Sequence, residues 1–328
     1  MTGRAGRAAI IAAIALALIS VPVWGGAGAR SLLILFAYSA ALAQMWNLLA
    51  GYAGLVTFGQ QIFVGLGGFT FAVGCERFGL GVWPAFALAA VVAALLAVPI
   101  GALTFRLKGG YFAVGSWVVA EVFRLMFGNW SYVGNASGMF VRPARSVDPW
   151  LLYYIAIGLL VGMIALVIGT LRSRPGLALM AIRDAEGAAA SLGVDVWRVK
   201  LLVFVVAAAG TALASALVTV QTPFIQPDAA FSIQWSAAAS FMVVVGGIGT
   251  VEGPILGAVI YVVLQEELGA YGTVHLIVLG SVSVIVMLVA PRGLAGLLRD
   301  RLGWIAFPVV RKAPPPRSNP PPSRPAFS

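Results

Sequence analysis

The sequence is short of charged side chains, cysteine and histidine, and these shortages exclude several classes of protein. Of 328 residues, 10% are charged and 61% are hydrophobic, and the mean hydropathy is +0.98. A soluble domain carries roughly 25% charged and about 45–50% apolar residues. No compact soluble core could hide this much apolar side chain, so an ordinary cytosolic enzyme and a disordered chain are excluded. The composition indicates a polytopic membrane protein.

The chain also lacks the groups that metal, redox and ATP chemistry need. Cys75 is the only cysteine and His275 the only histidine, which excludes an internal disulfide, a cysteine metal site and a multi-histidine centre. No Gly-Lys dipeptide occurs, so the phosphate-binding loop G-x-x-x-x-G-K-[ST] is absent. We therefore expect no metal, no cofactor and no enzymatic activity on this chain.

The net charge is +10 and the isoelectric point is near 10.4, values that in a soluble protein would suggest nucleic-acid binding. Here the lysines and arginines lie almost entirely between the apolar runs and in the last part of the chain. Basic loops of this kind face an anionic cytoplasmic leaflet. Nucleic acid is therefore not an expected partner, whereas the lipid bilayer is.

Ten apolar runs approach the length of about 20 residues that an α-helix needs to cross a bilayer. They lie at 8–24, 31–50, 56–75, 83–105, 109–127, 150–171, 200–221, 233–249, 253–268 and 274–290. The last two are short enough to be partial or re-entrant. The sequence predicts an all-α polytopic membrane protein with about 8–10 transmembrane helices.

The distribution of basic residues predicts that both termini are cytoplasmic. With ten spans, and leaving out the distal tail and Arg124 within a span, twelve basic residues fall on the inner side: Arg4, Arg7, Arg106, Lys108, Arg172, Arg174, Arg183, Arg198, Lys200, Arg292, Arg299 and Arg301. Four fall on the outer side: Arg30, Arg77, Arg142 and Arg145.

Three regions follow from this pattern. Residues 1–30 hold a first hydrophobic span and a short outer loop, although the basic start of this region also resembles a cleavable signal peptide. Residues 31–300 form the transmembrane domain. Residues 301–328 end in a proline-rich stretch that we expect to be a disordered cytoplasmic tail.

Two glycine-rich stretches differ from simple lipid-facing sequence. The first runs from 51 to 70, and the second from 246 to 258, at an expected inner turn. Such glycines either interrupt a helix that lines a pathway or let helices pack closely, and the glutamines either line that pathway or bond across helices. Both interpretations remain open. The candidate residues are Gly54, Gly59, Gln60, Gln61, Gly65, Gly67, Gly247, Gly249 and Gly253.

Glu121 and Arg124 lie three residues apart on one face of the run 109–127. Ionisable residues within a span mark candidate functional sites. The alternative is a self-neutralised structural pair near the outer interface.

The longest inner polar segment, 172–200, contains the pattern of a short amphipathic helix. Leu177, Met180 and Ala181 fit one face, and Gly193 can end the helix. The segment is either a docking helix for another protein or an interfacial helix on lipid headgroups. Its candidate docking residues are Arg183, Asp184, Glu186, Ala188, Ala189 and Gly193.

At these residues the chain resembles the permease subunits of bacterial branched-chain amino acid ABC importers, in particular the LivM-like branch. The resemblance covers about residues 31–300. It rests on NLLAGYAGLVTFGQQIFVGLGGFTFAV at 47–73, RLKGGYFAVGSWVVAEVFRL at 106–125, NASGM at 135–139, SRPGLALMAIRDAEGAAASLGVDVWRVKLLVFVVAAAGTALASAL at 173–217, FMVVVGGIGTVEGPILGA at 241–258 and APRGLAGLL at 290–298.

This resemblance implies a multi-pass protein of the bacterial inner membrane that works with two cytoplasmic ATPase subunits, a homologous second permease and an extracytoplasmic solute-binding protein. It implies that 172–200 docks the ATPase through an E-A-A-x-x-x-G element, of which Ala188, Ala189 and Gly193 match while Gly187 replaces the acid. Branched-chain amino acids are the implied solute. The alternatives are urea or another small solute, and a self-sufficient secondary transporter or channel.

Overall fold

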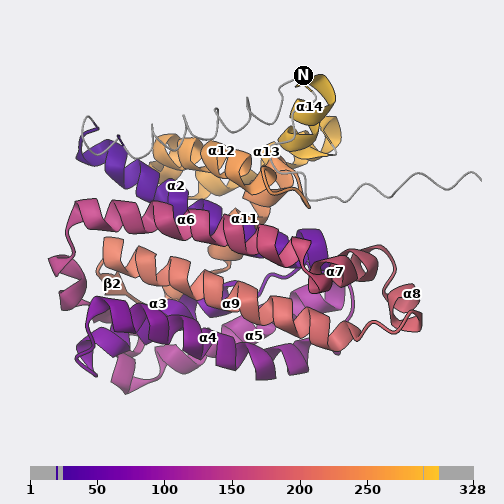
Figure 1. The fold of residues 1–328 in the computed structure, drawn as a ribbon. Coiled ribbons are helices and arrows are strands. Elements are labelled where there is room, and N and C mark those ends of the chain that lie inside the picture. The colour runs from indigo at the N-terminus through magenta and orange to yellow at the C-terminus, as the bar shows by residue number, and fades with distance from the viewer. Residues whose placement is uncertain (1–19, 21–24, 291, 303–328) are drawn as a thin grey trace, which may run out of the picture.

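The computed structural model describes residues 20, 25–290 and 292–302, and it is a bundle of helices (Figure 1). Seven helices in this part of the chain are long and apolar enough to cross a membrane. The prediction of an all-α polytopic membrane protein is confirmed. The run 8–24 and most of the tail 301–328 lie outside the described residues.

The helices follow the predicted runs closely. Eight of the nine runs in the described part coincide with observed helices to within four residues at each end. The helices that coincide with these runs are α2 (Ala27–Asn47, continued by the π-helical turn η1, Leu48–Tyr52), α4 (Val82–Thr104), α5 (Gly110–Gly128), α6 (Pro149–Arg172), α9 (Val196–Gln221), α11 (Ile233–Gly246), α12 (Gly253–Leu268) and α13 (Thr273–Val289), which precedes α14 (Gly293–Leu302).

Small residues let these helices approach one another, as is typical inside a membrane. Helix α4 packs on α3 and α9, and α2 packs on α6 (Figure 1). The buried face of α4 carries alanine at every fourth position, at Ala85, Ala89, Ala93 and Ala97. This face therefore lets α4 approach its neighbours closely.

The two ends of the bundle differ. One end carries the short helices α7 (Arg174–Asp184) and α8 (Glu186–Ser191), and we call it the inner end, following the orientation predicted from charge (Figure 1). The opposite, outer end carries the 3-10 helices η2 (Ser131–Val133), η3 (Asn135–Ser137) and η4 (Arg142–Ser146), the helix α10 (Pro227–Ala230) and a two-stranded antiparallel sheet of β1 (Met139–Phe140) and β2 (Phe224–Ile225). This sheet joins the connection that follows α5 to the connection that follows α9.

The predicted helix 56–75 is wrong in its first turn. The helix α3 spans Gln61–Glu76, and residues 54–60 are almost entirely non-helical. Gly54 has φ +69°, a left-handed conformation that ends the preceding helix, and a Cβ on Gly59 would lie 2.6 Å from the carbonyl oxygen of Ser116. The chain therefore re-enters the bundle as non-helical backbone before α3 begins, and we call residues 54–60 the re-entry segment.

The predicted single helix in 172–200 is also wrong, because the segment forms two helices with a break at Ala185, whose backbone is extended. Within α7, Gly176, Leu179 and Ile182 are buried, whereas Leu177 is exposed. A Cβ on Gly176 would lie 2.4 Å from the carbonyl oxygen of Leu171 in α6. This close approach folds α7 back on α6 and fixes which face is buried. Gly193, with φ +86°, follows the end of α8 as expected.

Candidate functional site

Three segments far apart in the sequence meet at the inner end. Arg183, near the end of α7, donates from Nη1 to the carbonyl oxygen of Gly51 in η1 at 3.0 Å. The same Nη1 would lie 3.2 Å from a Cβ on Gly249, in the loop between α11 and α12. A Cβ on Gly51 would lie 2.7 Å from the backbone nitrogen of Gly249, so only glycine permits this contact. We call residues 172–200 the docking segment. Arg183 therefore links the docking segment to the turn that precedes the re-entry segment.

Two buried amides of α2 hold the loop between α11 and α12 in place, and we call this loop, residues 247–252, the inner loop. Asn47 donates from Nδ2 to the carbonyl oxygen of Thr250 at 2.8 Å and accepts from the backbone N–H of Gly249 at 2.8 Å. Gln44 donates from Nε2 to the carbonyl oxygen of Val251 at 2.7 Å. The sequence analysis missed both side chains, although amides three residues apart inside an apolar run are a signal that could have identified them. They make the inner loop and the end of α2 one unit.

The re-entry segment lies between α5 and α11. On one side the Thr57 hydroxyl donates to the Ser116 hydroxyl at 3.0 Å, and on the other the Ser236 hydroxyl donates to the Phe58 carbonyl oxygen at 3.2 Å. The side chains of Val56 and Phe58 are 44% and 37% exposed. Non-helical backbone at membrane depth is tolerated only where protein covers it or where it lines a water-filled cavity. This face of the chain is therefore not a lipid-facing one.

The two glutamines lie inside the bundle and bond across helices, which is the packing alternative of the sequence analysis. Gln60 donates from Nε2 to the Leu42 carbonyl oxygen at 3.1 Å and to the Thr211 hydroxyl at 2.9 Å. Gln61 accepts from the Ser236 hydroxyl through Oε1. Both side chains are buried, so they fix the start of α3.

The remaining candidate glycines are places of close approach. A Cβ on Gly65 would meet the ring of Phe231 at 2.1 Å, and one on Gly67 would meet the Cα of Ala212 at 2.5 Å. Gly247, with φ +128°, and Gly253 approach each other, because a Cβ on Gly253 would lie 2.3 Å from the Gly247 carbonyl oxygen. These contacts fix how α3 packs on α9 and how the inner loop turns.

Glu121 and Arg124 are joined by a third charged residue. Arg124 donates to Glu121 Oε1 from Nε at 2.8 Å and from Nη2 at 2.5 Å, and it also donates from Nη1 to Asp228 Oδ1 in α10. The side chains of Arg124, Glu121 and Asp228 are 31%, 41% and 66% exposed. Sequence analysis missed Asp228 because it lies 104 residues from Arg124 in an outer connection, where no periodic pattern indicates a partner.

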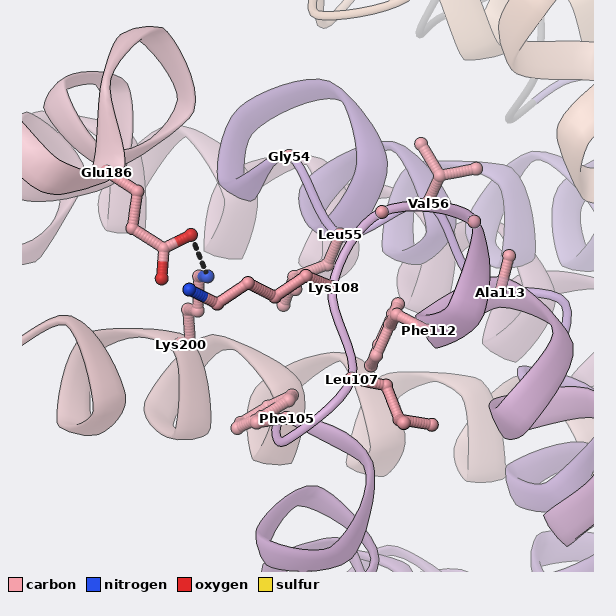
Figure 2. A pocket seen from close by; sticks show the side chains of 12 residues that line it. Gly54, Leu55, Val56, Phe105, Leu107, Lys108, Phe112, Ala113, Glu186 and Lys200 are labelled. Carbon is pink, nitrogen blue, oxygen red and sulfur yellow. Dashed lines mark hydrogen bonds and ion pairs between the residues drawn. The ribbon is translucent and has the colours of Figure 1, made fainter.

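A pocket of about 430 Å³ opens beside the docking segment (Figure 2). Glu186, at the start of α8, accepts from Lys200 Nζ at 2.8 Å, and Lys108 extends toward this pair (Figure 2). The other lining residues are Gly54, Leu55, Val56, Phe105, Leu107, Gly109, Gly110, Phe112 and Ala113. The pocket thus connects the docking segment to the first residues of the re-entry segment.

The segment α8 projects from the inner end and is mostly exposed (Figure 1). Ala188 is exposed and Ala189 is buried, while Asp184 pairs with Arg183 at 3.4 Å. Leu192, which the sequence analysis did not select, is 83% exposed. A large apolar side chain this open at the tip of a projecting helix is suited to contact with another protein.

The sequence is similar to one protein family and to two named proteins. The family model described as "Branched-chain amino acid transport system / permease component" matches residues 28–291. Two similar proteins are named high-affinity branched-chain amino acid transport system permease protein LivM. The one from Salmonella typhimurium is 28% identical over 288 residues and the one from Escherichia coli 29% over 286, and each match covers 78% of this chain and 67% of the relative. No solved structure matches.

Proposed function

Because the chain belongs to the family of permease components of branched-chain amino acid transport systems, we propose that it forms, with a homologous second permease, the pathway of an ABC importer for branched-chain amino acids. It is a multi-pass protein of the bacterial inner membrane and a transport subunit, not an enzyme. ATP hydrolysis belongs to separate ATPase subunits in this proposal, and an extracytoplasmic binding protein delivers the solute.

The bond between Arg183 and the Gly51 carbonyl oxygen carries this proposal. Alternating access requires a partner that binds two states of the permease with different affinities. ATPase subunits that hold α8 through Glu186, Ala188 and Leu192 would move α7 with it. Arg183 passes this displacement to η1, and the re-entry segment follows η1 directly in the chain.

The exposed face of the re-entry segment supports the proposal that a second permease subunit packs against this chain. Val56 and Phe58 lie open on non-helical backbone between α5 and α11. A homologous subunit opposite this face would cover the backbone and enclose a pathway between the two chains. A self-sufficient channel would instead need a pathway inside one chain.

The first experiment is purification of the native complex through a tag on this chain. We expect two ATPases, a sister permease and a binding protein to copurify, and leucine uptake by the reconstituted complex to require ATP. Leucine uptake by this chain alone in liposomes would support the secondary transporter or channel. ATP-dependent uptake of urea without uptake of leucine would support a different solute.

Arg183→Ala tests the coupling route in the same complex. A hydrogen bond to a charged group contributes about 1.5–3 kcal/mol, so we expect leucine uptake per ATP hydrolysed to fall roughly tenfold or more. The matched control is Arg198→Ala, which removes an exposed arginine of the same inner segment that pairs with Asp195, three residues before it. Normal coupling in Arg183→Ala would refute the route through Gly51.

A further inference from the structure

We propose that Glu121, Arg124 and Asp228 form a charged station on the solute pathway, which takes the carboxylate and the ammonium group of a zwitterionic α-amino acid. The inference rests on the proposed function and assigns the charged ends of the solute to named residues.

The station is built from two elements. Arg124 and Glu121 project from the outer half of α5, and Asp228 comes from α10 in the outer connection after α9. The guanidinium of Arg124 uses all three of its nitrogens, two on Glu121 and one on Asp228. Two carboxylates thus share one cation, and the group carries one surplus negative charge.

The charges and the position of this group argue against a lipid-facing site. Arg124 lies four residues before the end of α5, roughly 6 Å along the helix axis. A side chain that extends from this position to the lipid headgroups would point toward the outer end of α5. The guanidinium of Arg124 is instead held by Glu121, one turn toward the inner end. All three side chains are nevertheless partly open. Charged side chains in this position face a water-filled cavity or another protein.

The station shares its helix face with the re-entry segment's surroundings. Trp117, Glu121 and Arg124 follow one another at spacings of four and three residues, which places them on one face of α5. Ala113, four residues before Trp117 on the same face, lines the inner pocket together with Leu55 and Val56 of the re-entry segment. A solute that moves along this face from the outer end would therefore meet the charged station before it reaches the non-helical backbone.

The charges of the station complement those of an α-amino acid. A carboxylate accepts well from guanidinium nitrogens, so the solute can replace Asp228 on Nη1 of Arg124. Asp228, the most exposed of the three, is then free to pair with the ammonium group. One ion pair is exchanged for two, whereas an uncharged solute such as urea gains nothing from breaking the bond between Arg124 and Asp228.

The test uses the reconstituted complex with leucine-loaded binding protein. We expect Asp228→Asn and Arg124→Gln to lower the maximal leucine uptake tenfold or more, with an unfolding temperature close to that of the parent. Glu121→Gln changes the second carboxylate of the station, and we expect it to lower leucine uptake as well. Arg145→Gln, in the outer helix η4, is the matched control and should leave uptake unchanged.

A structural role is separated from a binding role by exchanging the charges. Arg124→Asp combined with Asp228→Arg keeps an ion pair between α5 and α10, so a purely structural clamp would regain uptake, and that result would overturn the inference. Unchanged uptake in Asp228→Asn and Arg124→Gln would overturn it too, while the proposed function would stand. A parent complex that imports only an uncharged solute would overturn both.

Discussion

The closest approach of α11 and α12 gives a prediction whose magnitude follows from the geometry. A Cβ on Gly257 would lie 1.7 Å from the carbonyl oxygen of Met242, whereas ordinary contact begins at 3.4 Å. The two helices would have to separate by roughly 1.5 Å or more to accept Gly257→Ala. Because the obstacle is backbone, no side chain can rotate away. We expect a cost at the upper end of the range for overpacking, about 3 kcal/mol.

Alanine itself is a better helix former than glycine by about 1 kcal/mol, so the net loss in the free energy of unfolding should be about 2 kcal/mol. Gly158→Ala in α6 is the matched control, because nothing lies within 4 Å of a Cβ there. Both variants gain the same stabilisation from the higher helix propensity of alanine. The difference between them therefore isolates the clash.

The assay is thermal unfolding in detergent, followed by a thiol-reactive dye. Cys75 is the only cysteine and is buried in the folded protein, so it reacts as the bundle opens. We expect the midpoint of Gly257→Ala to fall roughly 5 °C or more below that of Gly158→Ala. Equal midpoints, or a more stable Gly257→Ala, would refute the close approach of the two helices.

Two further predictions address the core and the topology. Gln60→Leu removes two buried hydrogen bonds across helices and should lower the free energy of unfolding by about 1–3 kcal/mol. The control is Gln234→Leu, which changes an exposed amide. Equal stability of the two variants would contradict the packing role of Gln60. Gly187→Cys in a Cys75→Ala background should react with a membrane-impermeant maleimide in inverted vesicles only, because position 187 is open and on the predicted inner side. Labelling in intact spheroplasts would reverse the orientation.

The sequence predicted the positions of the helices well because the bilayer imposes a simple requirement. A span must be apolar and long, and its backbone must bond within itself. The run 253–268 was predicted with the same bounds as α12. The helix breaks were harder to predict. Glycine indicates where a break is permitted, but the non-helical course of 54–60 depends on Ser116 and Ser236 from two other helices.

The site was predictable only where its residues are neighbours in the chain. Glu121 and Arg124 are three residues apart, and helical spacing alone brings them together. The bonds of Arg183 to Gly51 and of Arg124 to Asp228 join residues more than 100 positions apart. The break at Ala185 was not predictable from local preference either, since the alanines that follow favour a continuous helix.

The small outer sheet restricts where a passage can open. Its pairs Met139–Ile225 and Phe140–Phe224 tie the connection after α5 to the connection after α9, and Val141 donates its N–H to the Pro223 carbonyl oxygen beside them. These links join the two connections across the outer end of the bundle, so we expect the ends of α5 and α9 to move together. In the proposed assembly with a second permease, we therefore expect the outward gate to lie at the contact between the two subunits.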